Sequence, residues 1–233
     1  MSLFPLRGPR GEAALGEDHG LSATATTALI VAAVFVGAVL LVALLALQTR
    51  VPFPDLTRDP LAIMGKKSAP HLGFLSNLGA LLWCTTAAVC AFVGLRLMRD
   101  RDSRRRSLFL FAVAGFSAVL LFDDLFMVHE NLKLRMAHGD IALFVVYGIS
   151  AFCYIGAFRG VLSHIGVFAP LLAVALLGVS VAADVAKLTD QVEGTWPWVL
   201  EDGSKFVGIA LWTAFHLRAA WILDAGRRLG HEC

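Results

Sequence analysis

The amino-acid sequence predicts an all-α, polytopic integral membrane protein, a bundle of six transmembrane helices with both termini in the cytoplasm. Of its 233 residues, 58% are hydrophobic and only 16% are charged, and the mean hydropathy is +0.72. Soluble domains contain about 45–50% apolar residues. The apolar residues also gather in runs of about 20, the length that crosses a bilayer as a helix. Basic residues are not interleaved with aromatic ones, so a nucleic-acid partner is not expected.

The first predicted span follows a polar segment, residues 1–25, which we expect to lie in the cytoplasm. Residues 26–47 are longer than the apolar core of about 7–15 residues in a cleavable signal peptide. They are therefore interpreted as a retained transmembrane helix. The next stretch, residues 48–70, contains four prolines, which discourage a continuous helix. We expect a loop there, serving either as a lid or as a spacer.

Five further apolar segments complete the predicted bundle. They are residues 71–98, 107–131, 139–158, 165–188 and 199–223. Pro170 falls in the first turns of its helix, where proline is tolerated. Trp196 and Trp198 precede the last helix and are typical of the aromatic belt at a membrane interface. Residues 26–223 thus form one transmembrane domain, and residues 224–233 are predicted to be a cytoplasmic basic tail.

The arginines predict the orientation. Residues 96–106 contain six arginines between two predicted helices, and short loops rich in Lys and Arg stay in the cytoplasm. This assignment places 12 of the 20 Lys and Arg residues inside: Arg7, Arg10, the six loop arginines, Arg159, Arg218, Arg227 and Arg228. A bacterial inner membrane is the expected location.

The same topology brings acidic residues to the outer side, around the end of the third predicted helix. Ionisable groups within a bilayer are costly and usually face a protein interior or a watery cavity. In a continuous helix, Asp123 and Glu130 share a face, Asp124 points about 100° away, and His129 lies about 120° to the other side. We therefore expect Asp123 to face inward with either Glu130 or His129, and Asp124 to reach a neighbouring helix.

The last two predicted helices add further charges at this end. Asp184 and Lys187 lie on similar faces of one helix, and Glu201 and Asp202 are four and three residues before Lys205 on the other. Such spacings permit ion pairs. Glu201, Lys205 and Lys187 are therefore predicted to be ion-pair or relay residues, although they could simply tie helix ends together. His216 lies about 17 Å deeper at 1.5 Å per residue, too far to join the outer residues.

A metal-dependent membrane enzyme is the first interpretation of this set, as a hydrolase acting on a lipid or a small periplasmic molecule. Imidazole and carboxylate ligands suit Zn, Mn or Fe, and an open coordination position activates water. The candidate ligands are Asp123, His129, Glu130, Asp184 and Asp202. The sequence contains no H-E-x-x-H motif, so the divalent metal is inferred from residue types alone. Haem is not expected. It would need two histidines at matched depth on facing helices, and His71 with His129 is the one outer pair that could provide them.

Ser76 in the second predicted helix and Asp123 or Asp124 in the third have a layout that resembles the ceramidase and adiponectin-receptor group of membrane hydrolases. That group combines a serine, an acid and several histidines for zinc. The resemblance implies catalytic roles for Ser76, Asp123 and Asp124. The paired histidines of that group's last helix are missing, since residue 212 is Trp where a partner for His216 would be needed.

Two other functions remain open. In a proton- or cation-coupled transporter, Asp123 and Asp124 would titrate and Lys205 would be their counter-charge. In a non-catalytic membrane subunit, the same acids would hold helices or a partner protein together. The bilayer is the expected partner in every case, with a lipid or small-molecule ligand reaching the outer side in the first two.

Overall fold

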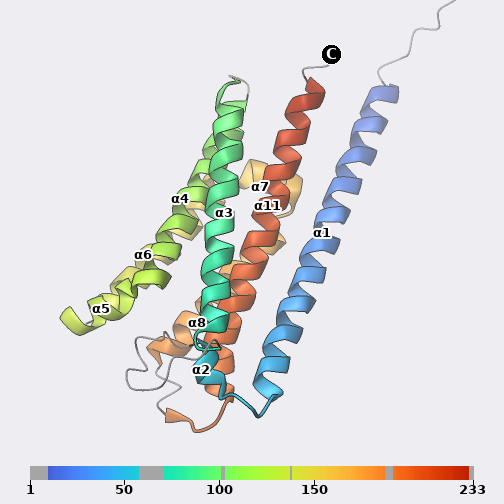
Figure 1. Cartoon of the computed structure of the whole chain (residues 1–233). Coiled ribbons are helices and arrows are strands. Elements are labelled where there is room, and N and C mark those ends of the chain that lie inside the picture. Colours follow the sequence, from blue (N-terminus) through green and yellow to red (C-terminus); the bar gives the residue numbers. More distant parts are fainter. Residues whose placement is uncertain (1–9, 58–70, 101–102, 137, 187–190, 231–233) are drawn as a thin grey trace, which may run out of the picture.

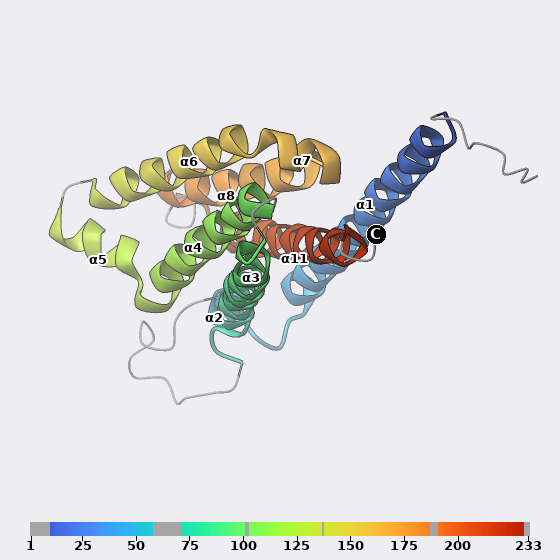
Figure 2. The same cartoon turned by 90° about the horizontal axis from the view of Figure 1, so that it is seen from above.

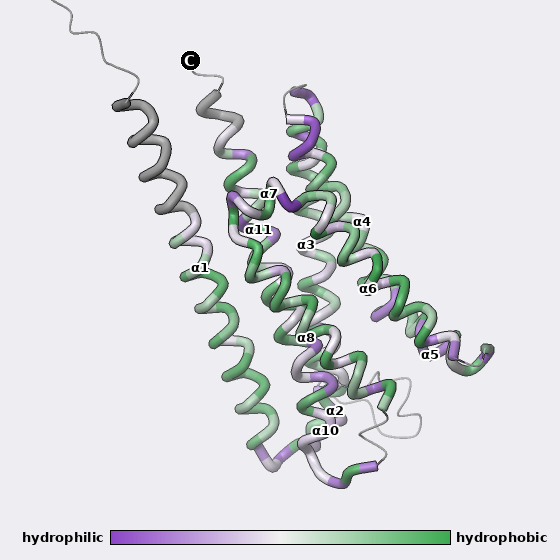
Figure 3. The backbone as a smooth tube through the Cα atoms, turned by 180° about the vertical axis from the view of Figure 1, so that it is seen from behind, coloured by the Kyte–Doolittle hydropathy of each residue, from purple (hydrophilic) through white to green (hydrophobic). Residues whose placement is uncertain are grey.

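The computed structural model describes residues 10–57, 71–100, 103–136, 138–186 and 191–230 (Figure 1). These residues form an all-α structure, which confirms the predicted fold class. Six helices are long and apolar enough to cross a membrane, so the chain is a multi-pass helical membrane protein. Figure 3 shows hydrophobic residues along the lengths of these helices.

The first span is part of a longer helix than the sequence predicts. Helix α1 runs over Arg10–Leu47, so the segment predicted to be a polar lead-in is helical from Arg10 onward. Its Ala, Leu and Glu residues are good helix formers. The predicted loop that follows contains a short helix, α2 (Phe53–Thr57). The rest of that loop, residues 58–70, lies outside the described residues, as does the choice between lid and spacer.

The predicted third span, residues 107–131, is wrong as a single helix. Helix α3 covers Phe74–Met98, and the next segment forms α4 (Arg104–Phe126) and α5 (Val128–Arg135). The break falls at Met127, whose φ of 47° is left-handed. Asn131 stabilises it, because its Nδ2 donates to the carbonyl oxygens of Phe126 and Met127 at 3.3 and 3.0 Å. Unsatisfied carbonyls at a helix end need such donors.

The next two spans agree with the prediction to within a few residues. Helix α6 covers Gly139–Ala157 and is followed by the short α7 (Arg159–Ile165). Helix α8 covers Phe168–Val185, after a turn at Gly166 with a φ of 129°. Glycine adopts that backbone conformation without steric strain, so α7 and α8 are separate helices.

The last span begins with an irregular turn and becomes the central helix. After α10 (Trp196–Trp198) come a π-helical segment, η3 (Val199–Gly203), and α11 (Ser204–Gly230). Helix α11 packs against α1, α3 and α8 (Figure 2). In the most apolar stretch of the last span, 72% of the residues are buried inside the protein, whereas in the other five spans this share is 17–39%. Polar side chains on α11 therefore lie inside the bundle, while the outward faces of the other helices are apolar.

The middle of the bundle contains a fully buried polar and aromatic core. The Oη of Tyr154 lies 2.8 Å from His216 Nε2, and His216 Nδ1 lies 2.7 Å from the carbonyl oxygen of Trp212. Trp212 in turn donates its indole N–H to Ser117 Oγ at 3.1 Å. Buried polar groups of this kind are stable when hydrogen-bonded. His216 thus lies apart from the outer acids, as expected from its depth.

The two ends of the bundle differ. The C-terminal ends of α3 and α11 and the N-terminal end of α1 lie at one end (Figure 1), and α2, α5 and α10 lie at the other (Figure 3). We refer to the end with α5 as the outer end, following the predicted topology. The orientation in the membrane remains a prediction.

Candidate functional site

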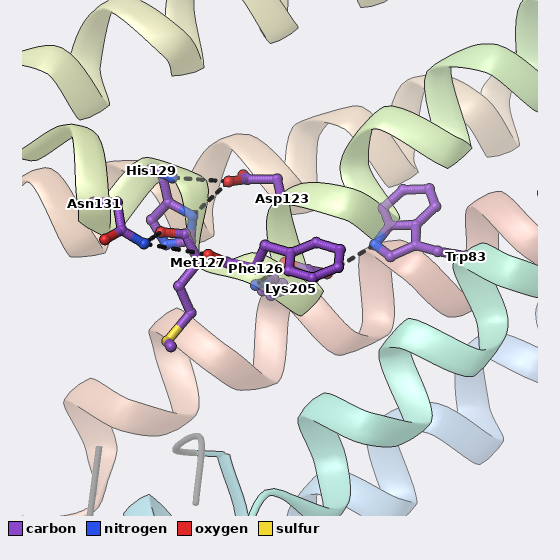
Figure 4. Close-up of polar contacts among 8 residues, drawn as sticks. Trp83, Asp123, Phe126, Met127, His129, Asn131 and Lys205 are labelled. Carbon is purple, nitrogen blue, oxygen red and sulfur yellow. Dashed lines mark hydrogen bonds and ion pairs between the residues drawn. The ribbon is translucent and has the colours of Figure 1, made fainter. Parts of the chain in front are cut away.

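The adjacent carboxylates Asp123 and Asp124 occupy the last turn of α4, at the outer end, and have different partners. Figure 4 shows Asp123 beside His129. Asp123 is buried, with 5% of its surface exposed. Asp124 is also largely covered, since 14% of its side chain is exposed. Charged carboxylates in such positions must be paired or hydrogen-bonded.

Asp123 is paired with His129. Its Oδ1 atom accepts the backbone N–H of His129 at 2.9 Å and lies 3.0 Å from the imidazole Nδ1. Burial disfavours the charged imidazole, but the hydrogen bond to Asp123 and its negative charge outweigh that effect. The pKa of His129 is therefore raised above its ordinary value of about 6.5. The break at Met127 makes this contact possible, because it turns α5 back toward the end of α4.

Asp124 is held between two neighbouring helices, as the helical angles predict. Its Oδ1 atom lies 2.6 Å from Lys205 Nζ of α11, and its Oδ2 atom accepts the indole N–H of Trp83 of α3 at 3.1 Å. Charge-assisted hydrogen bonds of this type are about twice as strong as neutral ones. Asp124 therefore joins α3, α4 and α11 at a single point.

A small pocket lies beside this ion pair. Its volume is about 20 Å³, room for about one water molecule. Its polar lining comes from Asp124, Asp202, Lys205, Ser76 and Thr57. The pocket is too small for a lipid or a sugar, so its contents are limited to water or a single ion.

A larger apolar groove lies on the other side of α4, between α4 and α6. It has a volume of about 410 Å³ and is lined by Ala118, Val119, Phe122, Asp123, Val128 and Tyr147. Asp123 and Tyr147 are the polar members of this lining. The buried acid thus faces a space large enough for a small organic molecule.

The π-helical segment η3 carries Glu201 and Asp202 just before Lys205. Such segments are rare and are frequent at functional sites. Gly203 closes the segment, and a Cβ atom there would lie 2.8 Å from Val42 Cγ1 of α1. Glycine is thus required for the close approach of α1 and η3. Asp202 lines the small pocket, whereas Glu201 does not.

The other predicted site residues are distributed differently. Ser76 lines the small pocket, but its hydroxyl donates to the carbonyl oxygen of Thr57 at 2.8 Å. Glu130 is exposed on α5, so of the two predicted inward partners of Asp123 it is His129 that contacts the acid. The break at Met127 ends the continuous helix that would have placed Glu130 on the face of Asp123. Asp184 lies half-buried in the last turn of α8 and lines neither space. Lys187 lies outside the described residues.

The predicted metal ligands do not converge. Within the part of the chain that the structure describes, no group of three His, Cys, Asp or Glu side chains is placed to hold a metal ion. Asp123 and His129 meet, but Asp202 belongs to the pocket on the other side of α4. Divalent metals in proteins usually have at least three protein ligands when they are catalytic. The metal therefore remains a prediction from residue types.

Two residues of the site, Trp83 and Tyr147, are not among the site residues predicted from the sequence. Trp83 is buried, and its indole N–H donates a hydrogen bond to Asp124. Tyr147 lines the groove beside Asp123. Tryptophan and tyrosine often place a polar atom against a partner when buried. Both residues are distant in sequence from the acids, so no local sequence pattern indicates these contacts.

Comparisons with known proteins give a family but no activity. No curated protein and no solved structure matches the chain. Residues 28–219, most of the chain and nearly all of the membrane bundle, match the family model described as Domain of unknown function (DUF8692). The chain therefore belongs to the DUF8692 family.

Proposed function

We propose that the protein is a proton-coupled membrane carrier, in which Asp123 and His129 exchange a proton and Lys205 is the fixed counter-charge of Asp124. The observation that carries this proposal is the separation of the two adjacent acids. Asp123 faces an open groove and contacts a titratable imidazole. Asp124 is held by Lys205 and Trp83.

The Asp123–His129 pair supports proton exchange because each group stabilises the charged form of the other. A neutral histidine titrates near pH 6.5, and the contact with Asp123 raises its pKa. Protonation of the pair changes the net charge beside the groove by one unit. A ligand in the groove would sense that change directly, since Asp123 is part of its lining.

The Asp124–Lys205 pair supports the same function by keeping the interior electrically balanced. It joins α4 to the central helix α11. Removing one partner of a covered pair leaves an uncompensated charge, which is strongly destabilising. We therefore assign to this pair a constant charge state through the cycle, and to Asp123 and His129 the variable one.

The metal-dependent hydrolase has less support. The Ser76 hydroxyl donates to the carbonyl oxygen of Thr57 rather than to a histidine or an acid that would activate it. Asp123 and His129 meet as a pair without a third ligand in the described residues. The arrangement favours acid–base exchange over metal coordination.

The test is a proton-flux measurement in liposomes that contain the full-length protein and an internal pH-sensitive dye. After an external acid pulse, wild-type protein should acidify the interior faster than empty liposomes, and Asp123→Asn should reduce this rate to the background. Glu193→Gln is the matched control, because it removes one exposed acidic charge that does not belong to the groove lining.

One result would overturn the proposal. If wild-type liposomes acidify no faster than empty ones, with or without candidate ligands, while Asp123→Asn only lowers the melting temperature, then the acids are structural. The protein would then be a non-catalytic membrane subunit.

A further inference from the structure

We infer that the groove between α4 and α6 binds a single-chain amphiphile with a cationic ammonium head, which enters from the bilayer. The inference rests on the proposed function, because it names the ligand class of the same Asp123 site. The occupant is identified by three properties of the groove: its size, its opening toward lipid, and the charge of its polar lining.

The size and the opening favour an alkyl chain. The volume of about 410 Å³ lies in the range of about 300–1,000 Å³ for small-molecule pockets. Val119 and Phe122 line the groove and are 51% and 58% exposed. Both belong to a helix long enough to span the membrane, so in the bilayer their exposed faces contact acyl chains. A ligand therefore reaches the groove sideways, from the lipid.

The polar lining favours a cationic head. Asp123 supplies a carboxylate and Tyr147 a phenol oxygen and an aromatic ring, and none of the residues that line the groove is basic. A carboxylate accepts hydrogen bonds from an ammonium group, and an aromatic ring attracts the same cation through its face. A sulfate or carboxylate head would meet only like charge or an uncharged apolar wall. The groove thus selects by charge.

The carboxylate of Asp123 belongs both to the groove lining and to the contacts inside the bundle. His129 from α5 contacts it, Tyr147 from α6 lines the same groove, Lys205 from α11 acts on it through charge, and Asp124 is its neighbour on α4. An ammonium head placed at Asp123 would therefore compete with His129 for the same carboxylate.

The test measures binding of decylammonium to the full-length protein in lipid nanodiscs by calorimetry near neutral pH. Decylammonium should bind saturably, whereas decanol and decyl sulfate should not. Asp123→Asn should weaken decylammonium binding at least about tenfold, since it removes the buried charge partner. Glu193→Gln should bind like wild type.

A second pair of variants tests the groove without touching the acid. Val119→Trp should fill the groove and abolish binding, whereas Val145→Trp adds the same bulk to a lipid-facing position of α6 outside the lining and should leave it intact. Equal binding of decyl sulfate, or normal binding by both Asp123→Asn and Val119→Trp, would overturn the inference. Flux without decylammonium binding would overturn the ligand class alone, whereas binding without any flux would overturn the carrier function and leave the groove assigned.

Discussion

Asp123 and Asp124 share a peptide bond but have different chemical environments. Successive residues on a helix point about 100° apart, so one carboxylate faces the groove and the other faces α3 and α11. Asp123 contacts an imidazole, which changes charge near neutral pH, whereas Asp124 contacts an ammonium group and an indole, which do not. Proton exchange and helix attachment can therefore be separated by single substitutions.

The stability of the protein should depend on pH through His129. Its pKa in the folded protein is raised, so the folded state binds the proton more tightly than the unfolded state does. The stabilisation is complete below about pH 6.5 and is lost as the pH rises through the raised pKa. Melting temperatures measured between pH 5.5 and 8.5, at about half-unit steps, should fall across this window.

The variant His129→Gln should remove that pH dependence. Glutamine cannot take up a proton, so its melting curve should change little over the same range. His164→Gln is the control, because His164 is exposed on α7, and α7 and α5 lie at opposite ends of α6 (Figure 2). An unchanged slope in His129→Gln would show that another group titrates.

Asp124 and Lys205 should be energetically coupled. Asp124→Asn and Lys205→Met should each destabilise the protein, and the double variant should be more stable than the sum of the two losses implies. The Lys205 side chain is 35% exposed, so solvent screening reduces the coupling to about 1–2 kcal/mol. A double-mutant cycle from chemical or thermal unfolding measures it. Strictly additive losses would mean that the ion pair contributes nothing.

At the scale of elements, the break between α4 and α5 determines the site. A continuous helix would carry Glu130 on the face of Asp123, and the sequence predicts either Glu130 or His129 as the inward partner of that acid. The actual break falls at Met127, with no glycine or proline to signal it. Each hydrogen bond that stabilises the break involves a side chain. Asn131 donates to two backbone carbonyls, and Asp123 accepts the backbone N–H of His129. Sequence periodicity detects helices but not these competing local bonds.

Met127 should tolerate glycine better than a branched residue. Its left-handed φ of 47° costs a non-glycine residue about 1 kcal/mol or more. Met127→Gly should therefore keep the melting temperature or raise it, whereas Met127→Val should lower stability by about 1–2 kcal/mol relative to glycine. Circular dichroism during heating measures both. Equal stability of the two variants would show that the turn relaxes in solution.

At the scale of the whole molecule, hydropathy was sufficient for the fold. The number of spans follows from apolar runs, because each crossing must satisfy its backbone within one helix. The contacts of Trp83 and Tyr147 depend instead on how helices distant in sequence pack together. The sequence therefore located the outer acids, but it did not show that a pocket and a groove lie on opposite sides of α4.

The predicted topology has a direct test. In a variant without its native cysteines, Arg99→Cys should react with a membrane-impermeant maleimide only from the cytoplasmic side. Leu134→Cys, at a position 85% exposed on α5, should react from the outside. The positive-inside rule gives this orientation. Labelling of Leu134→Cys from the cytoplasm, with Arg99→Cys labelled from outside, would show that the topology is the reverse of the predicted one.

The π-helical segment affects how the central helix responds to a change in chain length. A π-helical turn holds one residue more than the α-helical turn that it replaces, so deleting one residue within Val199–Gly203 would convert the segment to regular α-helix. Lys205 would then still face Asp124. A deletion within the regular helix α11 has no surplus residue to remove, so it would rotate everything after it by about 100°. The segment therefore absorbs a change in length between the tryptophans at the interface and Lys205 without changing the phase of the central helix.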